Sequence, residues 1–322
     1  MGAEPLSATV IVPCASNLAG LSALLSTLAE QSAPHQLIVV DNGSPGSAAS
    51  ALARRAGAEA IRFEQNRGYT VAINAAARAA EGEAIVLVND DELLEADFVA
   101  AIVAALDPTA GIVMAAGVMR EAGDPTLIDS AGMELDATLL VFDYLNGQPL
   151  GAAASAPSPL GPSGAAAAFE RSAYLDVGGF DEAIFAYWED ADLVLRMRGG
   201  GARCALAAGA IGTHHHSATL GSGSAEKDYL TGWGRSYMLR KWGVARGRRL
   251  PAVVARELAI TAGQLVVDRN LGGVRGRIDG FRAPVARRRY PESELDGARA
   301  SGFAETLARR LRRRARLRSA AR

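Results

Sequence analysis

The sequence predicts an α/β protein with a mostly parallel central sheet and helices on both faces. Short runs of β-branched residues alternate with stretches of helical periodicity, and the segments that connect them are short. The run at residues 84–88 is apolar throughout, as in a strand that is buried on both faces. Successive strands also end in polar, loop-forming residues, which predicts a ligand-binding crevice along one edge of the sheet.

The first third of the chain holds four strand–helix pairs. Each strand is a run of aliphatic residues, and each helix places its apolar residues three or four positions apart. The predicted strands are residues 9–14, 36–42, 60–63 and 84–88. The predicted helices are residues 18–31, 47–56, 69–80 and 98–106.

The remaining elements are separated by a polar segment that ends near Pro162 and suggests hairpins. No uninterrupted apolar run approaches the roughly 20 residues of a membrane-spanning helix, so none is expected. The predicted strands are residues 111–117, 164–169 and 202–207, and the predicted helices are residues 171–177, 189–198, 229–242 and 253–267.

The formal net charge of -1 conceals an asymmetry along the chain. Residues 235–322 hold 23 Lys and Arg against 7 Asp and Glu, so a basic C-terminal part follows an acidic body. Such a part suggests contact with an anionic surface. The two cysteines, Cys14 and Cys204, are too few for a disulfide framework, which is typical of a reducing compartment. The N-terminal residues lack the basic segment of a signal peptide.

Three groups of polar residues are candidates for a functional site. Asp90 and Asp91 follow the buried strand at 84–88, and such oxygen ligands suit Mg²⁺ or Mn²⁺; a solvated turn or helix cap is the alternative. Glu189 and Asp190 lie in the first turn of a predicted helix, a place that the helix dipole alone would favour. The histidine run that begins at His214 offers one ligand, with a structural histidine as the alternative.

Seven motifs stand in the order TVIVP (9–13), VVDNGS (39–44), NRGY (66–69) with Asn74, NDD (89–91), GGFDE (178–182), WEDADL (188–193) and HHHSAT (214–219). Their order and spacing resemble those of glycosyltransferase family 2, the inverting enzymes of the GT-A fold. The resemblance covers about residues 8–245 and looks closest to the rhamnosyltransferase-like members that build bacterial surface glycans. It implies a GT-A, Rossmann-like fold.

The resemblance implies roles for individual residues. Asp190 matches the general base of the family, with Glu189 as its competitor. Asp91 matches the principal metal ligand and Asp90 the second, while His214 matches the histidine that closes over the metal and the diphosphate. Asp41 matches the acid that contacts the nucleotide base. The implied donor-binding residues are Pro13, Asp41, Asn42, Asn66, Asn74, Asn89 and Asp90.

The expected activity is metal-dependent, inverting transfer of a sugar, with rhamnose preferred. The donor is a dTDP- or UDP-sugar, and the acceptor is a polyprenyl-diphosphate-linked glycan or a polysaccharide in surface glycan synthesis. Departure of the diphosphate needs Mg²⁺ or Mn²⁺, and the acceptor hydroxyl needs one base. The alternative is a catalytically silent GT-A domain that binds a glycan or a partner. A nucleotidyltransferase is disfavoured because residues 15–19 lack a basic side chain.

The motifs predict a catalytic domain at residues 1–226 and a helical, Arg-rich extension at residues 227–322. Residues 304–317 place leucines among arginines, which suits a helix on an anionic membrane surface. A solvated tail is the alternative, and no nucleic-acid partner is expected. The expected localisation is cytoplasmic, and contact of the tail with lipid would make the protein peripheral on the inner face of the plasma membrane.

Overall fold

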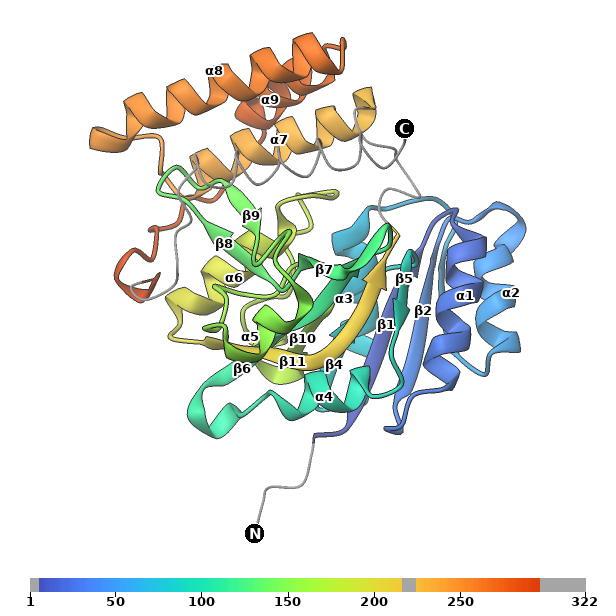
Figure 1. Ribbon diagram of the computed structural model, residues 1–322. Coiled ribbons are helices and arrows are strands. Elements are labelled where there is room, and N and C mark those ends of the chain that lie inside the picture. Colours follow the sequence, from blue (N-terminus) through green and yellow to red (C-terminus); the bar gives the residue numbers. More distant parts are fainter. Residues whose placement is uncertain (1–5, 216–223, 296–322) are drawn as a thin grey trace.

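The structure is a computed structural model that describes residues 6–215 and 224–295. A curved central sheet carries helices on both faces, and three further helices pack together above it in the view of Figure 1. The predicted α/β class is confirmed. The described strands are β1 (Ala8–Cys14), β2 (Gln36–Asn42), β3 (Glu59–Phe63), β4 (Ala84–Leu87), β5 (Glu92–Leu94), β6 (Ile112–Glu121), β7 (Asp124–Ser130), β8 (Met133–Leu135), β9 (Val141–Asp143), β10 (Ala167–Glu170) and β11 (Arg203–His214).

The main sheet has the order β3-β2-β1-β4-β10-β6-β11-β5, and β7 pairs with β6 outside this path. Strands β1 to β4 are parallel, as predicted. Strand β10 is antiparallel to both of its neighbours, β4 and β6, and β11 is parallel to β6. Strands β1, β2, β4, β6 and β11 therefore all end at the same edge of the sheet, where open α/β sheets bind ligands.

Two hydrophobic layers lie on the two faces of the sheet. Along β1, Val10 and Val12 join one layer and Ile11 joins the other, as the alternation of a pleated strand requires. Helices α1, α2 and α4 cover the first layer, while α3, α5 and α6 cover the second. The bounds are α1 (Leu18–Ala29), α2 (Ala48–Arg55), α3 (Tyr69–Ala79), α4 (Phe98–Ala104), α5 (Arg171–Asp176), α6 (Glu189–Gly199), α7 (Ala225–Lys241), α8 (Leu250–Val267) and α9 (Gly272–Arg282).

The last strand is longer than predicted. The sequence predicts an end at Ala207, but β11 continues to His214 after a shift of register between Leu206 and Ile211. The run Ala207 to Gly212 is too small and too glycine-rich to read as a strand by propensity, yet pairing with β5 and β6 holds it extended. His214 consequently lies at the end of a strand rather than in a following loop.

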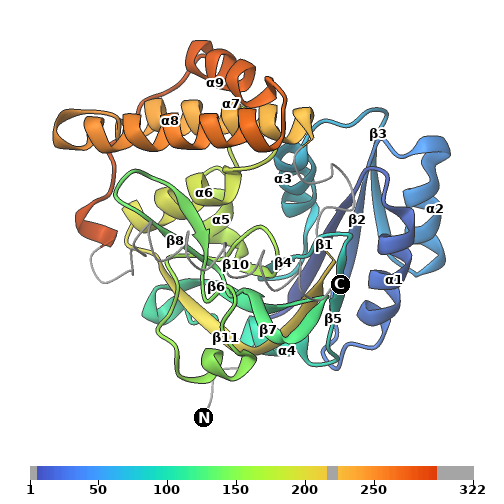
Figure 2. The ribbon, with the colours of Figure 1, turned by 45° about the horizontal axis from the view of Figure 1, so that its top comes forward.

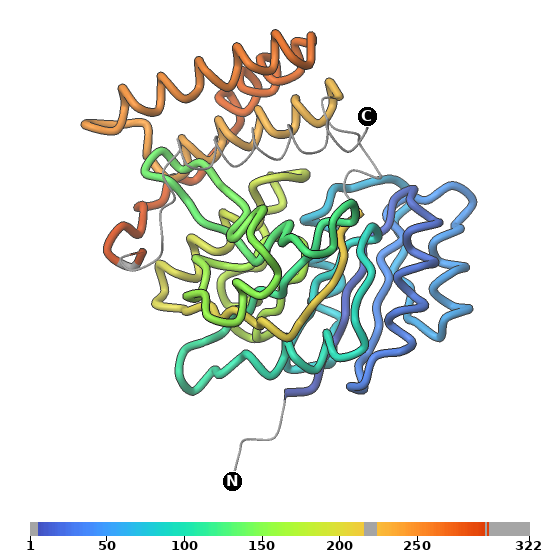
Figure 3. The backbone as a smooth tube through the Cα atoms, viewed as in Figure 1, coloured from blue at the N-terminus to red at the C-terminus, as the bar shows by residue number. Residues whose placement is uncertain are grey.

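The polar segment before Pro162 adds β7 to the main sheet as an antiparallel partner of β6 and then forms a second, two-stranded sheet. Figure 3 traces the chain from β6 through β7, β8 and β9 and back into the sheet at β10. Strands β8 and β9 make a small antiparallel pair of their own, as the predicted hairpins require. Strand β7 contributes to the site because it carries Asp129, which is 3% exposed.

Helices α7, α8 and α9 form the C-terminal group seen in Figure 2. Tyr237 of α7 and Trp242, which follows the helix, belong to the same hydrophobic layer as α3 and α6, so the group is anchored to the body of the protein. The sequence analysis missed α9 because its glycines have low helix propensity. A methyl group on Gly276 or Gly280 would collide with a backbone carbonyl of α7, so these glycines allow the two helices to approach closely.

One stretch of the described chain is long and apolar enough to cross a bilayer by length and composition, contrary to the expectation from the sequence. It is Gly247–Val267, with a mean hydropathy of 1.4 over its most apolar window. The sequence analysis missed it because Arg256 and Glu257 interrupt the apolar run. Only 6% of that window is buried inside the protein. Residues 304–317, predicted to lie on a membrane, are outside the described residues.

Asp192 joins α6 to the C-terminal group through a buried network of charges. Its carboxylate accepts a bond from Arg196 at 2.8 Å, pairs with Lys241 at 2.7 Å and accepts the indole N–H of Trp242 at 3.1 Å. The side chain is fully buried. Asp192 therefore has a structural role in α6, in contrast to Glu189 and Asp190 at the start of that helix.

We expect Asp192→Ala to lower the free energy of unfolding by about 3–5 kcal/mol, because it leaves two buried cations short of a partner. Urea denaturation followed by circular dichroism measures this loss. The matched control is Asp176→Ala, since Asp176 is an exposed aspartate on α5. A loss below about 1 kcal/mol in Asp192→Ala would show that the network contributes little to stability.

Candidate active site

The chemistry-bearing side chains gather at the edge where the parallel strands end. The turn after β4 supplies Asp91, the first residue of β5 is Glu92, and the last residue of β11 is His214. Antiparallel pairing of β5 with β11 sets Glu92 directly opposite His214. The main chain adds a further tie, since the backbone N–H of His215 donates to the carbonyl oxygen of Asp91 at 2.9 Å.

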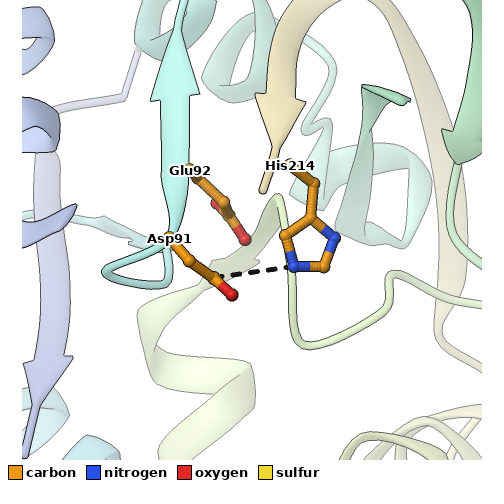
Figure 4. Close-up of side chains that lie close together, drawn as sticks. All are labelled: Asp91, Glu92 and His214. Atoms are coloured by element: carbon orange, nitrogen blue, oxygen red, sulfur yellow. Dashed lines mark ion pairs between the residues drawn. The ribbon is translucent and has the colours of Figure 1, made fainter. Parts of the chain in front are cut away.

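Asp91, Glu92 and His214 form a group that could hold a metal ion (Figure 4). One ligand atom from each of the three residues lies within 4.8 Å of the others. The Nε2 atom of His214 is 3.5 Å from a carboxylate oxygen of Asp91. The two carboxylates supply the oxygen ligands that suit Mn²⁺ and Mg²⁺, and the imidazole adds one nitrogen ligand.

The carboxylate of Glu92 is buried in a way that a bound cation would explain. Its side chain is 1% exposed, and neither of its oxygens has a hydrogen-bond partner among the described residues. Burial raises the pKa of its carboxyl to about 8, while the nearby His214 acts in the opposite direction. A bound divalent ion would satisfy both orphaned oxygens and hold the carboxylate ionised.

The sequence analysis missed Glu92, although it is the next residue after the NDD motif. The sequence predicts Asp90 as the second metal contact, but the side chain of Asp90 turns toward the N-terminus of α1. There Asn17 donates to its carboxylate at 3.4 Å and to its backbone carbonyl at 2.8 Å. The contacts with Asn17 hold the side chain of Asp90 apart from the group formed by Asp91, Glu92 and His214. Burial raises the pKa of Asp90 to about 6.

Asp129 of β7 holds the ring of His214. The Nδ1 atom of His214 lies 3.0 Å from a carboxylate oxygen of Asp129. An ionised carboxylate can only accept a hydrogen bond, so the imidazole must be the donor. Nδ1 therefore carries a proton, and Nε2 is directed toward Asp91. Binding of a metal ion at Nε2 would release the proton of that nitrogen. Burial lowers the pKa of His214, but the bonds to Asp129 and Asp91 outweigh it and raise the pKa to about 10.

We expect Asp129→Asn to weaken Mn²⁺ binding by about 10–100-fold, because an asparagine orients the imidazole less firmly and withdraws its negative charge. Titration of the purified protein with Mn²⁺, followed by electron paramagnetic resonance of the free ion, measures this affinity. Asp124→Asn at the exposed start of β7 is the matched control. Equal affinities in the two variants would show that Asp129 does not position the histidine.

The second carboxylate group, Glu189 and Asp190, begins helix α6. Asp190 accepts the backbone N–H of Gly164 at 3.1 Å and that of Ala191 at 2.7 Å, so both of its oxygens are oriented. Burial raises its pKa. Glu189 is 8% exposed with one oxygen that has no partner among the described residues, and burial together with the charge of Asp190 raises its pKa to about 8.

The backbone before this helix is held in an unusual conformation. Tyr187 and Trp188 have φ values of 66° and 79°, in the left-handed region that bulky residues rarely adopt. The indole N–H of Trp188 donates to the carbonyl oxygen of Thr231 in α7 at 3.0 Å, which fixes the turn. The sharp turn presents Glu189 and Asp190 at the helix N-terminus, where the dipole stabilises negative charge.

Tyr69 shows that the two carboxylate groups share one neighbourhood. Its hydroxyl donates to the carbonyl oxygen of Gly164 at 3.1 Å, beside the backbone N–H that Asp190 accepts. Burial raises the pKa of Tyr69, and the negative charges of Glu189, Glu92 and Asp190 add to this effect. Carboxylates of both groups therefore act on the pKa of the Tyr69 hydroxyl. The sequence alone indicates no role for Tyr69 beyond the NRGY turn.

Asp41 and Asn42, predicted to bind the donor, organise the loop after β2. Asp41 is fully buried and accepts bonds from Ser44, from Ser50 and from Arg62, the last at 2.9 Å. Burial raises its pKa, but the bonds from Ser50 and Ser44 outweigh this and leave it below the usual range. Contact of Asp41 with a nucleotide base stays a prediction.

Two of the predicted asparagines lie close together and a third lies apart. The side chain of Asn42 donates to Asn66 at 2.9 Å, and together they hold the NRGY turn. Asn74 instead donates to Phe180 and Glu182 and accepts from Tyr174 and from the N–H of Phe180, so its capacity is used within the GGFDE loop. Its contact with a donor stays a prediction.

Pro13 and Asn89 lie at the ends of neighbouring strands. Pro13 is near the end of β1, beside Val40 of β2, and Asn89 follows β4. The backbone carbonyl of Asn89 accepts the N–H of Glu92 at 3.3 Å, which closes the turn that carries Asp90 and Asp91. Ser217 and Thr219, predicted to belong to the loop beyond His214, are outside the described residues.

The family model described as "Glycosyl transferase family 2" matches residues 9–178, which is more than half of the chain. The chain belongs to glycosyl transferase family 2. The match contains the strand ends that carry Asp41, Asp90 and Asp91, while Asp190 and His214 lie beyond it. Among curated proteins, no sequence matches this family 2 chain significantly.

Solved structures show that this family 2 chain has the GT-A fold. GalNAc-T7 with UDP, GalNAc and Mn²⁺ is 11% identical with a TM-score of 0.64, over 92% of this chain. The mannosyltransferase PcManGT of Pyrobaculum calidifontis, with GDP-Man and Mn²⁺, is 18% identical with a TM-score of 0.54, over 95% of this chain and 79% of its own. TarS 1–349 of S. aureus is 15% identical with a TM-score of 0.52, over 85% of this chain and 78% of its own. The match spans only 57% of the GalNAc-T7 chain.

Proposed function

We propose that the protein is an inverting glycosyltransferase that moves a sugar from a nucleoside diphosphate to an acceptor hydroxyl. The observation that carries the proposal is that one sheet edge brings Asp91, Glu92 and His214 into the same neighbourhood as Glu189 and Asp190. The first group suits the charge of a departing diphosphate. The second suits the proton of an attacking hydroxyl.

Asp91, Glu92 and His214 would hold Mg²⁺ or Mn²⁺, which when bound supplies positive charge to stabilise the leaving diphosphate. The buried, unpartnered oxygens of Glu92 support this assignment. Asp129 keeps the His214 ring oriented, and the pairing of β5 with β11 keeps Glu92 beside it. These residues are therefore positioned before a donor arrives, which reduces the reorganisation needed during the reaction.

Asp190 would accept the proton of the acceptor hydroxyl. The N–H groups of Gly164 and Ala191 fix its carboxylate, and each oxygen keeps a lone pair for the hydroxyl. Its raised pKa brings its basicity closer to neutral pH, where a general base is most effective. With one base and no covalent nucleophile, the acceptor oxygen would bond to the anomeric carbon as the bond to the nucleoside diphosphate breaks and Asp190 takes the proton. The configuration at the anomeric carbon therefore inverts.

The donor and the acceptor are proposed at a coarser level. The complexes of GalNAc-T7 with UDP and of PcManGT with GDP-Man support a nucleoside diphosphate as the donor's leaving group. We favour a dTDP- or UDP-sugar, with rhamnose as the sugar and a lipid-linked or polysaccharide acceptor, on the resemblance of the seven motifs. Cytoplasmic localisation is part of the same proposal.

Calorimetric titration with a panel of nucleoside diphosphates, each with Mn²⁺ and with a chelator, tests the proposal. We expect Mn²⁺-dependent binding of one pyrimidine nucleotide. Incubation with sugars carried on that nucleotide, together with an acceptor, should then release the nucleoside diphosphate. Binding without any release would favour a silent GT-A domain that acts as a binding module. A protein that binds no nucleotide in any condition would refute the transferase.

A further inference from the structure

Helix α8 turns an apolar face away from the protein. Figure 1 shows it as the outermost helix of the C-terminal group, with α7 and α9 beneath it, and in Figure 2 it lies in front of α7. Leu258 is 67% exposed and Val266 is 74% exposed. Every exposed residue of α8 is apolar or glycine: Leu250, Pro251, Ala252, Val254, Ala255, Leu258, Ala259, Ala262, Gly263, Leu265, Val266 and Val267.

The polar side chains of α8 face inward instead. Glu257 accepts bonds from Arg235 at 2.6 Å and from Arg277 at 3.0 Å, and Arg256 lies 3.7 Å from a carboxylate oxygen of Asp136. A surface helix in water normally does the opposite, with its charges outward and its apolar stripe on the core. The inverted arrangement indicates that the outer face of α8 meets an apolar medium.

The charges around this face identify the medium. Between residues 246 and 275, every exposed charged side chain is an arginine: Arg246, Arg248, Arg269 and Arg275. Two of them precede the helix and two follow it, so both ends of the apolar face carry positive charge. An apolar face bounded by arginines complements an anionic lipid surface, where acyl chains lie beneath negatively charged headgroups.

Two other arrangements fit these contacts less well. A helix that spans the bilayer would carry Arg256 and Glu257 into hydrocarbon, away from the partners that they hold in the protein. A second copy of the chain, packed on the same face about a two-fold axis, would bring arginine-rich ends close to one another. A helix that lies in the plane of the membrane keeps every ion pair and separates no charges.

We propose that the outer face of α8 docks on an anionic lipid bilayer, parallel to its surface. This inference goes beyond the proposed sugar transfer and does not depend on it, because lipid binding can be measured without donor or acceptor. It places the membrane contact on α8, whereas the sequence analysis placed it on residues 304–317. Docking would hold the catalytic edge of the sheet at a fixed distance from lipid.

Sedimentation of the full chain with vesicles tests the inference. Vesicles of phosphatidylcholine containing phosphatidylglycerol are compared with vesicles of phosphatidylcholine alone. We expect Leu258→Glu/Val266→Glu to weaken binding to the anionic vesicles at least 10-fold, because it places two acids in the apolar face. The charge-matched control, Ala23→Glu/Ser26→Glu, alters two exposed positions of α1 and should bind like the wild type.

The variants separate α8 from the arginines at the end of the chain, which all of them retain. Circular dichroism and thermal unfolding show whether each variant is folded. Wild-type protein that fails to bind anionic vesicles would overturn the inference, as would full binding by Leu258→Glu/Val266→Glu. Light scattering without lipid covers the remaining outcome: a dimer that becomes a monomer in Leu258→Glu/Val266→Glu would assign the face to a second copy.

Discussion

Replacement of Asp190 by asparagine should reduce turnover by on the order of 10²–10⁴-fold and leave donor binding nearly unchanged. An asparagine has nearly the shape of the aspartate and can still accept one backbone N–H, from Gly164 or from Ala191. It cannot take a proton from the acceptor hydroxyl. Steady-state rates with saturating donor, together with calorimetric affinity for the nucleotide, measure the two effects separately.

Glu189→Gln is the matched control, because it removes the neighbouring carboxylate from the same helix turn. We expect a smaller loss of turnover there than in Asp190→Asn. A larger loss in Glu189→Gln would exchange the roles of the two residues. Turnover of Asp190→Asn within a few-fold of the wild type would refute the general base.

The same pair should set the pH dependence of the wild type. A general base works only when it is deprotonated, and burial raises the pKa of both carboxyls, to about 8 for Glu189. Because the two groups interact, they titrate as a pair. Turnover is therefore expected to increase with pH through the neutral range, and the residual activity of Asp190→Asn should lose most of that increase.

Replacement of Asp91 by alanine should abolish the effect of Mn²⁺ on nucleotide binding. The loss should be on the order of 10³-fold, about 4 kcal/mol, since a cation contributes several kcal/mol of charge stabilisation to a bound diphosphate. Only Glu92 and His214 of the group would remain, with the Nε2 atom of His214 no longer facing Asp91. Calorimetric titration with the nucleoside diphosphate, with and without Mn²⁺, measures the loss.

Asp97→Ala provides the control for this experiment, because Asp97 is exposed and lies outside the site on the same segment. It should bind the nucleotide like the wild type. Addition of a chelator should reduce the wild type to the affinity of Asp91→Ala and leave that variant unchanged. If nucleotide binding by Asp91→Ala still depended on Mn²⁺, Asp91 would not be a metal ligand, and the metal site would have to be formed by other residues.

The parts of the fold that could be predicted depend on short-range patterns. The strands β1, β2 and β4 are aliphatic runs, and the leucines of α1 recur at helical spacing, so each was found within a few residues of its bounds. The second half of β11 and the whole of α9 could not be found this way. Partners that are distant in sequence stabilise both, and local composition argues against both.

The candidate site divides in the same way. Asp91, Asp190 and His214 could be chosen from motifs, but Glu92 and Asp129 join the group through the pairing of β5 and the placement of β7. No local signal in the sequence reports either contact. Asn74, also chosen from a motif, makes its hydrogen bonds within a buried loop, and its contact with a donor stays a prediction.

The glycines of α9 have a consequence for how the C-terminal helices diverge between related chains. Where backbone touches backbone, the spacing of α7 and α9 is set by peptide groups, which no mutation can change. A side chain at Gly276 could be accommodated only if the whole helix moved outward. Small residues four positions apart should therefore identify this three-helix unit in distant relatives better than its hydrophobicity does. The outer residues can change with their surroundings, whereas the close contact of α7 with α9 requires glycine or another very small residue.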